Sequence, residues 1–151
     1  MRHEMKFLLF AAALLIIGGC KPSDDRPRVE IILPAGLSGH VWIVEDVEGQ
    51  DIPLSNGEYR FTVAANGVIR VRSLAALRAD HNLSSHFDNG DALPLGDRSS
   101  DEQTALRGRF SRGGPDLQAV GFFVGTAKQL RDQKYDPWYP PDVEIVDHCC
   151  Y

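Results

Sequence analysis

Short stretches of the chain alternate between hydrophobic and polar side chains, as strands with one buried face do. In residues 59–63, aromatic and branched side chains occupy the odd positions and polar ones the even positions. Residues 40–45 are apolar on both faces, as in a strand that is covered on both sides or lies near an edge. Residues 29–33 are rich in branched side chains. We predict a strand over each of these three stretches.

An Asn66-Gly67 pair separates residues 59–63 from a second strand-like stretch at residues 68–72. Asn-Gly tolerates the positive φ angles that a two-residue hairpin turn requires. The sequence therefore predicts a tight antiparallel hairpin at this place. Residues 48–51, which contain a glycine among polar side chains, predict another turn.

Residues 81–115 are mostly polar and contain three clusters of turn-forming residues. A structureless loop of this length is uncommon in a small domain. We therefore expect short strands within it, near residues 84–87 and residues 104–110.

Three further stretches complete the expected elements. Residues 73–80 predict a helical turn or an irregular crossover, and the apolar run at residues 117–125 predicts a central strand. Thr126 is placed to cap a short helix over residues 127–133. Several short strands, glycine-rich turns and a single helix together predict an all-β fold, a small antiparallel β-sandwich.

The first twenty residues follow a different pattern. Residues 1–6 are basic overall, and the eleven residues 7–17 contain no polar side chain. Such a run is too short to cross a bilayer as a helix, which takes about twenty apolar residues, but it has the order of a secretory signal. The small residues Gly18 and Gly19 then allow a peptidase to approach the backbone.

Ile17-Gly18-Gly19-Cys20 resembles the lipobox of bacterial lipoproteins. The resemblance implies cleavage between Gly19 and Cys20, attachment of a diacylglycerol to the Cys20 thiol, and acylation of the new amine by a fatty acid such as palmitate. Cys20 would then be the mature N-terminus and would bind the protein to a lipid bilayer. The alternative is a buried helix whose end happens to hold a cysteine.

On this interpretation the chain has four parts and belongs to the bacterial cell envelope. Residues 1–19 are the signal peptide, 20–28 the lipidated N-terminus and tether, 29–135 the β-sandwich domain, and 136–151 a tail of proline, aromatic and acidic residues. Lys21 follows the cysteine, at the position where an aspartate commonly retains lipoproteins in the inner membrane. By similarity to that rule, the outer membrane is favoured in an organism with two membranes.

The net charge limits which partners are expected, and the cysteine content limits what can stabilise the fold. Removing residues 1–19 takes away two basic residues and one acidic residue, so the net charge changes from −5 to −6. A nucleic-acid partner is not expected, because phosphates require a basic face. Cys149 and Cys150 rarely bond each other as sequence neighbours, because the ring that they would close is strained. Packing must therefore stabilise the fold.

Several motifs resemble those of an uncharacterised family of bacterial exported and lipoprotein domains. The family shares an opening Pro-x-Gly-tyrosine-x-Gly-x-Val, a middle Pro-x-Asn-Gly-hydrophobic turn and a closing Phe-x-Val-Gly-Thr. The matching segments are residues 32–41, 53–54, 59–63, 66–69 and 122–126. Leu37 replaces the usual tyrosine, and Ala64-Ala65 stand where a proline would precede Asn-Gly. The resemblance implies a transthyretin-like or carboxypeptidase-regulatory-like β-sandwich and implies no activity.

The segment Gly36-Leu37-Ser38-Gly39-His40 is close to the Gly-x-Ser-x-Gly nucleophile elbow of hydrolases, with a histidine in place of the last glycine. An elbow requires a strand-to-helix turn in an α/β sheet, whereas a strand is expected to follow this segment. The alternative is a tight turn whose glycines adopt unusual backbone angles.

Two groups of residues are candidates for metal binding. His81, His86, Asp88 and Asp91 lie in one polar segment, but zinc sites usually repeat short spacings and no second cluster completes one here. Residues 148–150, His-Cys-Cys, offer soft ligands or thiols that could join another chain. Solvated side chains explain the same residues, so we assign no metal, no cofactor and no catalytic residue.

The remaining candidates are basic and aromatic surface residues. The local basic excess consists of Arg98, Arg107, Arg109 and Arg112. These arginines could meet anionic lipid or polysaccharide, or simply solvate a loop. Trp138 and Tyr139 lie between prolines and could dock a partner, or fold back over the open edge of the sandwich, which we prefer.

Together these observations predict a membrane-anchored envelope lipoprotein that acts as a non-enzymatic binding or interaction module. Its partners are then the lipid bilayer, through acylated Cys20, and an envelope protein. The alternative is an envelope hydrolase or metal-binding protein that uses Ser38 and His40, or the loop at residues 81–91.

Overall fold

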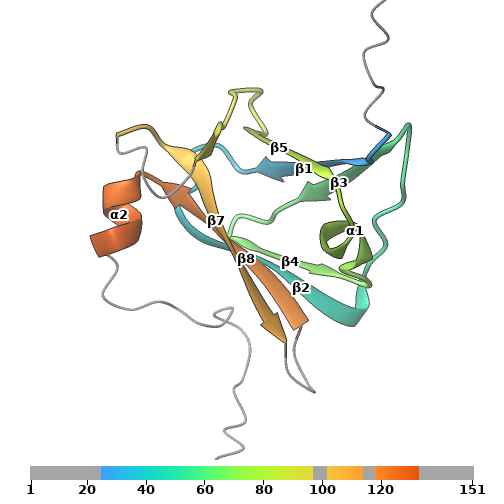
Figure 1. Cartoon of the computed structure of the whole chain (residues 1–151). Coiled ribbons are helices and arrows are strands. Elements are labelled where there is room, and N and C mark those ends of the chain that lie inside the picture. Colours follow the sequence, from blue (N-terminus) through green and yellow to red (C-terminus); the bar gives the residue numbers. More distant parts are fainter. Residues whose placement is uncertain (1–24, 97–101, 114–117, 133–151) are drawn as a thin grey trace, which may run out of the picture.

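The computed structural model describes residues 25–96, 102–113 and 118–132, which form two β-sheets and two short helices (Figure 1). The strands are β1 (Arg28–Leu33), β2 (Gly39–Gln50), β3 (Glu58–Thr62), β4 (Val68–Val71), β5 (Asn82–Phe87), β6 (Leu95–Gly96), β7 (Ala105–Gly113) and β8 (Gln118–Gly125). The helices are α1 (Ala75–Arg78) and α2 (Ala127–Asp132).

The strands are divided between a three-stranded sheet, in the order β3-β1-β5, and a five-stranded sheet, in the order β4-β2-β8-β7-β6. In the three-stranded sheet both pairs of neighbours are parallel. In the five-stranded sheet β8 is antiparallel to both of its neighbours, whereas β2 is parallel to β4 and β6 is parallel to β7. The prediction of a mostly β fold is confirmed. The expected antiparallel arrangement is wrong for two of the four strand pairs in the five-stranded sheet and for both pairs in the three-stranded sheet.

The parallel pairs follow from the path of the chain between β1 and β5. Consecutive strands in this stretch alternate between the two sheets, so each connection crosses from one sheet to the other. A chain that reverses direction at every crossing arrives in a given sheet pointing the same way each time. For this reason β1, β3 and β5 are parallel to one another, and so are β2 and β4.

The predicted hairpin across Asn66-Gly67 is wrong, because β3 and β4 lie in different sheets. The turn itself is present: the Gly67 N–H donates to the Ala64 carbonyl at 2.9 Å, and the Val68 N–H donates to the Asn66 side-chain oxygen at 3.1 Å. The turn leads from one sheet to the other. Before it, the Val63 N–H donates to the Ile32 carbonyl of the three-stranded sheet at 2.9 Å, and after it the Gly67 carbonyl accepts a 2.8 Å hydrogen bond from the Trp42 N–H of the five-stranded sheet. Alternation predicts which face of a strand is buried, but not which strand lies beside it.

The two sheets share one hydrophobic core. The alternating side chains of β1 point into it, and so do the inward residues of the strands of the other sheet. The fully or nearly buried members from strands are Val29, Ile31, Leu33, Val41, Ile43, Phe61, Ile69, Val71, Leu106, Val120, Phe122 and Val124. Leu74, Ala76 and Leu77, in and just before α1, extend the same core.

Most other predicted elements are confirmed. Strands β5 and β7 occur where short strands were expected, β8 lies between β2 and β7, and α1 is the expected helical turn. The Thr126 hydroxyl accepts a hydrogen bond from the Gln129 N–H at 3.1 Å, and the Gln129 side chain accepts one from the Thr126 N–H at 2.8 Å. This reciprocal pair starts α2 as predicted.

The prediction of a turn at residues 48–51 is wrong, because β2 continues to Gln50. The pairing of β2 with β4 is interrupted instead, since Glu45 and Gln50 both lie opposite Val71. The extra residues form a bulge, and Gly49 lies so close to Val71 that an added Cβ would be 2.5 Å from its carbonyl carbon. The glycine and polar residues therefore mark a bulge in a strand rather than its end.

Candidate functional site

The face of the three-stranded sheet that points away from the core carries a row of charged side chains. Because Val29 and Ile31 are fully buried, alternation turns Arg28 and Glu30 of β1 to the other side. The pairing of β1 with β3 then places Glu58 opposite Arg28 and Arg60 opposite Glu30. Opposite charges therefore face each other at two successive positions.

Ion pairs join five of these side chains, which we call the ion-pair row: Arg28, Glu58, Arg60, Glu30 and His86. Glu58 is 3.8 Å from the Arg28 Nε and 3.0 Å from the Arg60 Nε. Glu30 is 3.0 Å from the Arg60 Nε and 3.3 Å from the His86 Nδ1. The row thus crosses all three strands of the sheet.

Arg60 lies between two carboxylates at the centre of the ion-pair row. Its Nε–H donates to Glu58, whereas the Glu30 Oε2, equally near, makes no hydrogen bond within the described residues and counts only as a charge contact. The hydrogen bond to Glu58, followed by the charge of Glu30, raises the pKa of Arg60 above its ordinary value. The charges of the two arginines balance those of the two glutamates. The arginine side chains of Arg28 and Arg60 are 64% and 65% exposed, whereas those of Glu58 and Glu30 are 14% and 17% exposed, so solvent meets mainly the guanidinium groups.

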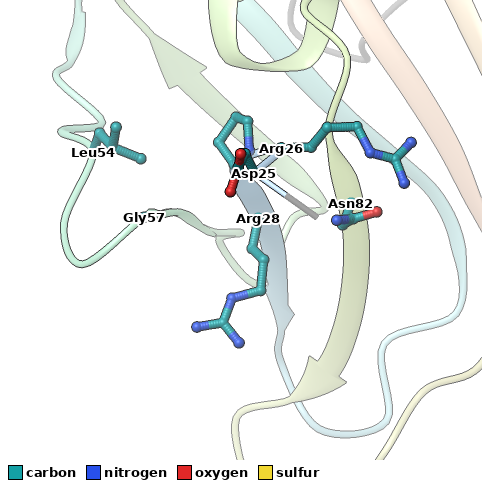
Figure 2. A pocket seen from close by; sticks show the side chains of 7 residues that line it. Asp25, Arg26, Arg28, Leu54, Gly57 and Asn82 are labelled. Carbon is teal, nitrogen blue, oxygen red and sulfur yellow. The ribbon is translucent and has the colours of Figure 1, made fainter. Parts of the chain in front are cut away.

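An open pocket of about 590 Å³ lies at the edge of this sheet where its three strands begin. Figure 2 shows Leu54, from the loop before β3, on one side of the pocket, with Arg26, Arg28 and Asn82 across from it. Arg26 is 3.5 Å from Asp80, and both side chains are largely exposed. The lining combines two apolar side chains, Leu54 and Pro27, with charged ones and the amide of Asn82.

The structure does not form a nucleophile elbow from Ser38 and His40. Residues 34–38 connect β1 to β2, and the Leu37 N–H donates to the Pro34 carbonyl at 3.0 Å, so a strand-to-strand turn is present. Ser38 is exposed. The His40 ring stacks on Trp42 at 6.4 Å and meets Phe123 edge-on at 5.4 Å. The tight-turn interpretation is confirmed for this segment.

The four candidate metal ligands of residues 81–91 have separate partners. The His81 Nδ1 is 2.7 Å from the Ala79 carbonyl, and His86 pairs with Glu30. Asp88 accepts a 2.9 Å hydrogen bond from the Ala35 N–H, and Asp91 bonds Asn89. Within the ranges that the structure describes, no three His, Cys, Asp or Glu side chains gather where they could hold a metal ion.

The prediction that Arg107 belongs to a basic surface is wrong, because Arg107 is only 1% exposed. Its Nε–H donates to the Gly125 carbonyl at 2.7 Å, and a second nitrogen donates to the Gln103 carbonyl at 2.5 Å. Arg107 therefore ties the start of β7 to the end of β8. Arg98 and the side chains of Arg109 and Arg112 lie outside the described part of the structure.

The remaining candidates also lie outside the described residues. These are Gly19 and Cys20 at the signal cleavage site, Trp138 and Tyr139, and residues 148–150. Their roles stay predictions.

Sequence reasoning missed the ion-pair row, although its signal is present. Glu30 and Arg60 are polar positions within two predicted strands, and Glu58 directly precedes the second of them. The sequence could have shown that these side chains point away from the core. It could not have shown that β1 and β3 are neighbours, which is what places the opposite charges together.

Comparisons with known proteins add little to this description. No protein-family model matches the chain, and no curated protein does. A solved structure from Bacillus anthracis, provisionally described as a lipoprotein, shares 13% identity over 78% of this chain and 84% of that one, with a TM-score of 0.44. A likeness of this strength establishes neither a shared fold nor a shared function. Among the described residues, no helix is long and apolar enough to cross a membrane.

Proposed function

We propose that this protein is a lipoprotein of the bacterial envelope, anchored to a membrane through acylated Cys20. The observation that carries the proposal is the lipobox-like Ile17-Gly18-Gly19-Cys20, directly after a basic start and a short apolar run. The position of β1 supports it, because the first strand begins at Arg28, eight residues after Cys20. A short polar tether before a folded domain suits a surface-anchored protein.

The anchor provides enough affinity to hold the domain at a surface. Each buried methylene group adds about 0.8 kcal/mol of membrane affinity, and two or more acyl chains give stable attachment. The diacylglycerol alone supplies two chains.

Mass spectrometry of the protein purified from its native cells tests the proposal. The expected chain begins at Cys20 and carries a diacylglycerol on its sulfur. Cys20→Ser should move the protein from the membrane fraction to the soluble fraction, while Cys149→Ser, the matched control, leaves it in the membrane fraction. An unmodified Cys20 thiol, or a chain that still begins at Met1, would contradict the proposal.

The proposal also covers the choice of membrane. Lys21 follows the acylated cysteine in place of a retaining aspartate, which favours the outer membrane where two membranes are present. Separation of the two membranes on a density gradient tests this, since Lys21→Asp should move the protein to the inner-membrane fraction. An unchanged distribution would remove the outer-membrane part of the proposal and leave the anchor untouched.

We extend the proposal to the domain, which we place among transthyretin-like sandwiches that bind partners rather than catalyse a reaction. Two sheets around one core support the sandwich, and the ion-pair row offers a polar contact surface. Ser38 lies in a connection between two strands, which argues against a nucleophile elbow.

Alanine variants distinguish binding from catalysis, with any phenotype of a gene deletion as the readout. Ser38→Ala tests the hydrolase alternative and His81→Ala tests the metal alternative, because His86 itself belongs to the ion-pair row. Arg60→Gln changes the centre of that row. Binding predicts that Ser38→Ala keeps the wild-type phenotype while Arg60→Gln loses it. If Ser38→Ala abolishes function and the folded protein remains in the membrane, the hydrolase alternative replaces the binding module.

A further inference from the structure

The edge of the three-stranded sheet where the chain enters the domain is fixed in position by backbone hydrogen bonds. The Arg28 N–H donates to the Gly57 carbonyl at 2.9 Å, and the Asn82 N–H donates to the Pro27 carbonyl at 3.0 Å. Residues 27 and 28 are therefore held between the loop before β3 and the start of β5. Because the strands are parallel, all three begin at this one edge.

Leu54 is an exposed apolar side chain at the same edge. It is 53% exposed and lines the pocket together with Arg26, Arg28 and Asn82 (Figure 2). Among the described residues the other large hydrophobic side chains that are exposed to this degree are Val47 and Leu95. Leu95 lies in β6 at the far edge of the five-stranded sheet, opposite Leu106 near the start of β7.

The tether limits which side of the domain can face a bilayer. Arg28 is the eighth residue after Cys20, and eight residues span at most about 28 Å when fully extended. A domain of about 100 residues is roughly 34 Å across, given a radius of gyration of about 13 Å. The tether is therefore too short to reach around to the far side.

We propose that this entry edge is the surface with which the domain contacts the bilayer that holds Cys20, with Leu54 in the interfacial layer. The inference rests on the proposed function, since it requires the anchor. A short tether gives the edge a high effective concentration at the membrane surface, so one leucine and the pocket around it suffice for contact. Figure 1 shows the start of β7 and α2 on the opposite side of the molecule from the point where β1 begins.

The charged side chains of the entry edge are of both signs rather than mostly basic, since Asp25 lines the pocket beside Arg26 and Arg28. Arg26 pairs with Asp80 and Arg28 pairs with Glu58. The edge can thus meet both the phosphate and the ammonium groups of zwitterionic lipid headgroups. We expect the contact to persist in vesicles of phosphatidylcholine alone and not to require anionic lipid.

A fluorescence quenching experiment on the acylated full-length protein tests the inference. Leu54→Cys and Leu95→Cys, each in a background with Cys149→Ser and Cys150→Ser, are labelled with an environment-sensitive fluorophore and reconstituted into phosphatidylcholine vesicles that contain a nitroxide-headgroup lipid. Leu95 is the matched control because its exposed fraction, 51%, is close to the 53% of Leu54. We expect quenching at position 54 to exceed quenching at position 95 by at least about twofold, because a short linker restricts the edge to the surface.

One outcome would overturn the membrane-facing edge, and a different one would overturn the proposed anchor. Equal quenching at the two positions, or stronger quenching at position 95, in protein whose mass shows acylated Cys20, overturns the membrane-facing edge and leaves the anchor intact. Protein that lacks the acyl chains and fails to bind vesicles contradicts the proposed function itself. Circular dichroism of both labelled variants confirms that each remains folded.

Discussion

Gly121 sets how closely an aromatic ring can lie on the five-stranded sheet. It is paired with Trp42 across β8 and β2, and a Cβ added to Gly121 would be 2.6 Å from the Trp42 Cζ3. Trp42 is 3% exposed and packs with Val44, Val68 and Ala119 in a cluster separate from the main core. The indole therefore occupies the space that a side chain at position 121 would need.

Gly121→Ala should destabilise the fold by about 1–3 kcal/mol, because the added methyl overpacks a site that a rigid indole already fills. Urea denaturation followed by tryptophan fluorescence or circular dichroism measures the loss.

A double-mutant cycle identifies the cause of that loss. In a Trp42→Leu background the same glycine substitution should cost less than about 1 kcal/mol, because the leucine leaves room for the methyl. An equal cost in both backgrounds would show that contact with the indole is not the reason.

Asp46 links the bulge of β2 to β4. Its carboxylate accepts a 2.9 Å hydrogen bond from the Glu48 N–H and another from Arg70 at 2.9 Å. The hydrogen bond from the Glu48 backbone, followed by that from Arg70, lowers the pKa of Asp46 below its ordinary value of 3.8. The folded state therefore favours the ionised carboxylate more than the unfolded state does.

Asp46→Asn should reduce stability at neutral pH, and the reduction should shrink as the pH falls. A carboxyl whose folded-state pKa is lowered contributes its stability above the unfolded-state pKa, and this contribution is lost as the pH falls through the folded-state pKa. Urea denaturation of wild type and variant at pH 6 and pH 3 measures the two differences.

Glu48→Gln is the control for this experiment, because it removes the same charge nearby while keeping the backbone N–H that bonds Asp46. It should show a smaller pH dependence than Asp46→Asn. A loss in the Asp46 variant that is as large at pH 3 as at pH 6 would rule out the carboxylate as the source.

The connection between β3 and β4 shows how a short element determines which sheet each strand joins. Gly67 has a φ of +78°, and a Cβ there would be 2.7 Å from the His40 carbonyl oxygen. The connection therefore needs both a left-handed backbone and close approach to β2. Gly57, in the turn before β3, has a φ of +77°, but a Cβ added there would have no neighbouring atom within 4 Å.

These two glycines form a matched pair. Gly57→Ala should cost about 1–2 kcal/mol, the usual penalty of an L-residue in the left-handed region. Gly67→Ala should cost at least about 1 kcal/mol more, because its backbone must also move away from the His40 carbonyl. Thermal denaturation of the two variants compares them, and equal losses would show that the close approach of Gly67 to β2 does not add to the cost.

At the scale of the whole molecule, the main core is formed by residues between Val29 and Val124. Both sheets and α1, which contribute the residues of this core, lie within residues 28–125. A fragment of residues 25–132 contains every described element. It should therefore fold independently.

We expect this fragment to unfold in one cooperative transition, with a midpoint within about 4 °C of the full mature chain, which corresponds to about 1 kcal/mol at this size. Circular dichroism melts of the fragment and of the chain from residue 20 to 151 measure the difference. A fragment that melts without a cooperative transition would show that the fold also needs residues 20–24 or 133–151.

The sequence by itself determined the elements and the faces that they bury. Residues 59–63 alternate because Phe61 lies in the core and Arg60 does not, and Thr126 and Gln129 specify the start of α2 locally. These features depend on neighbours within a few positions along the chain, so the pattern of residues contains them. The anchor at Cys20 likewise stays a prediction from a local motif.

Only the tertiary structure decided which strands are neighbours and what their outward residues do. Asn66-Gly67 is compatible with a hairpin and with a crossing between sheets, and the contact of Gly67 with β2 selects the crossing. That choice makes β1 and β3 neighbours, which brings Glu30 and Glu58 to Arg60, while the pairing of β7 with β8 buries Arg107. Strand partners are chosen by contacts between distant parts of the chain, and such contacts leave no periodic signal in the sequence.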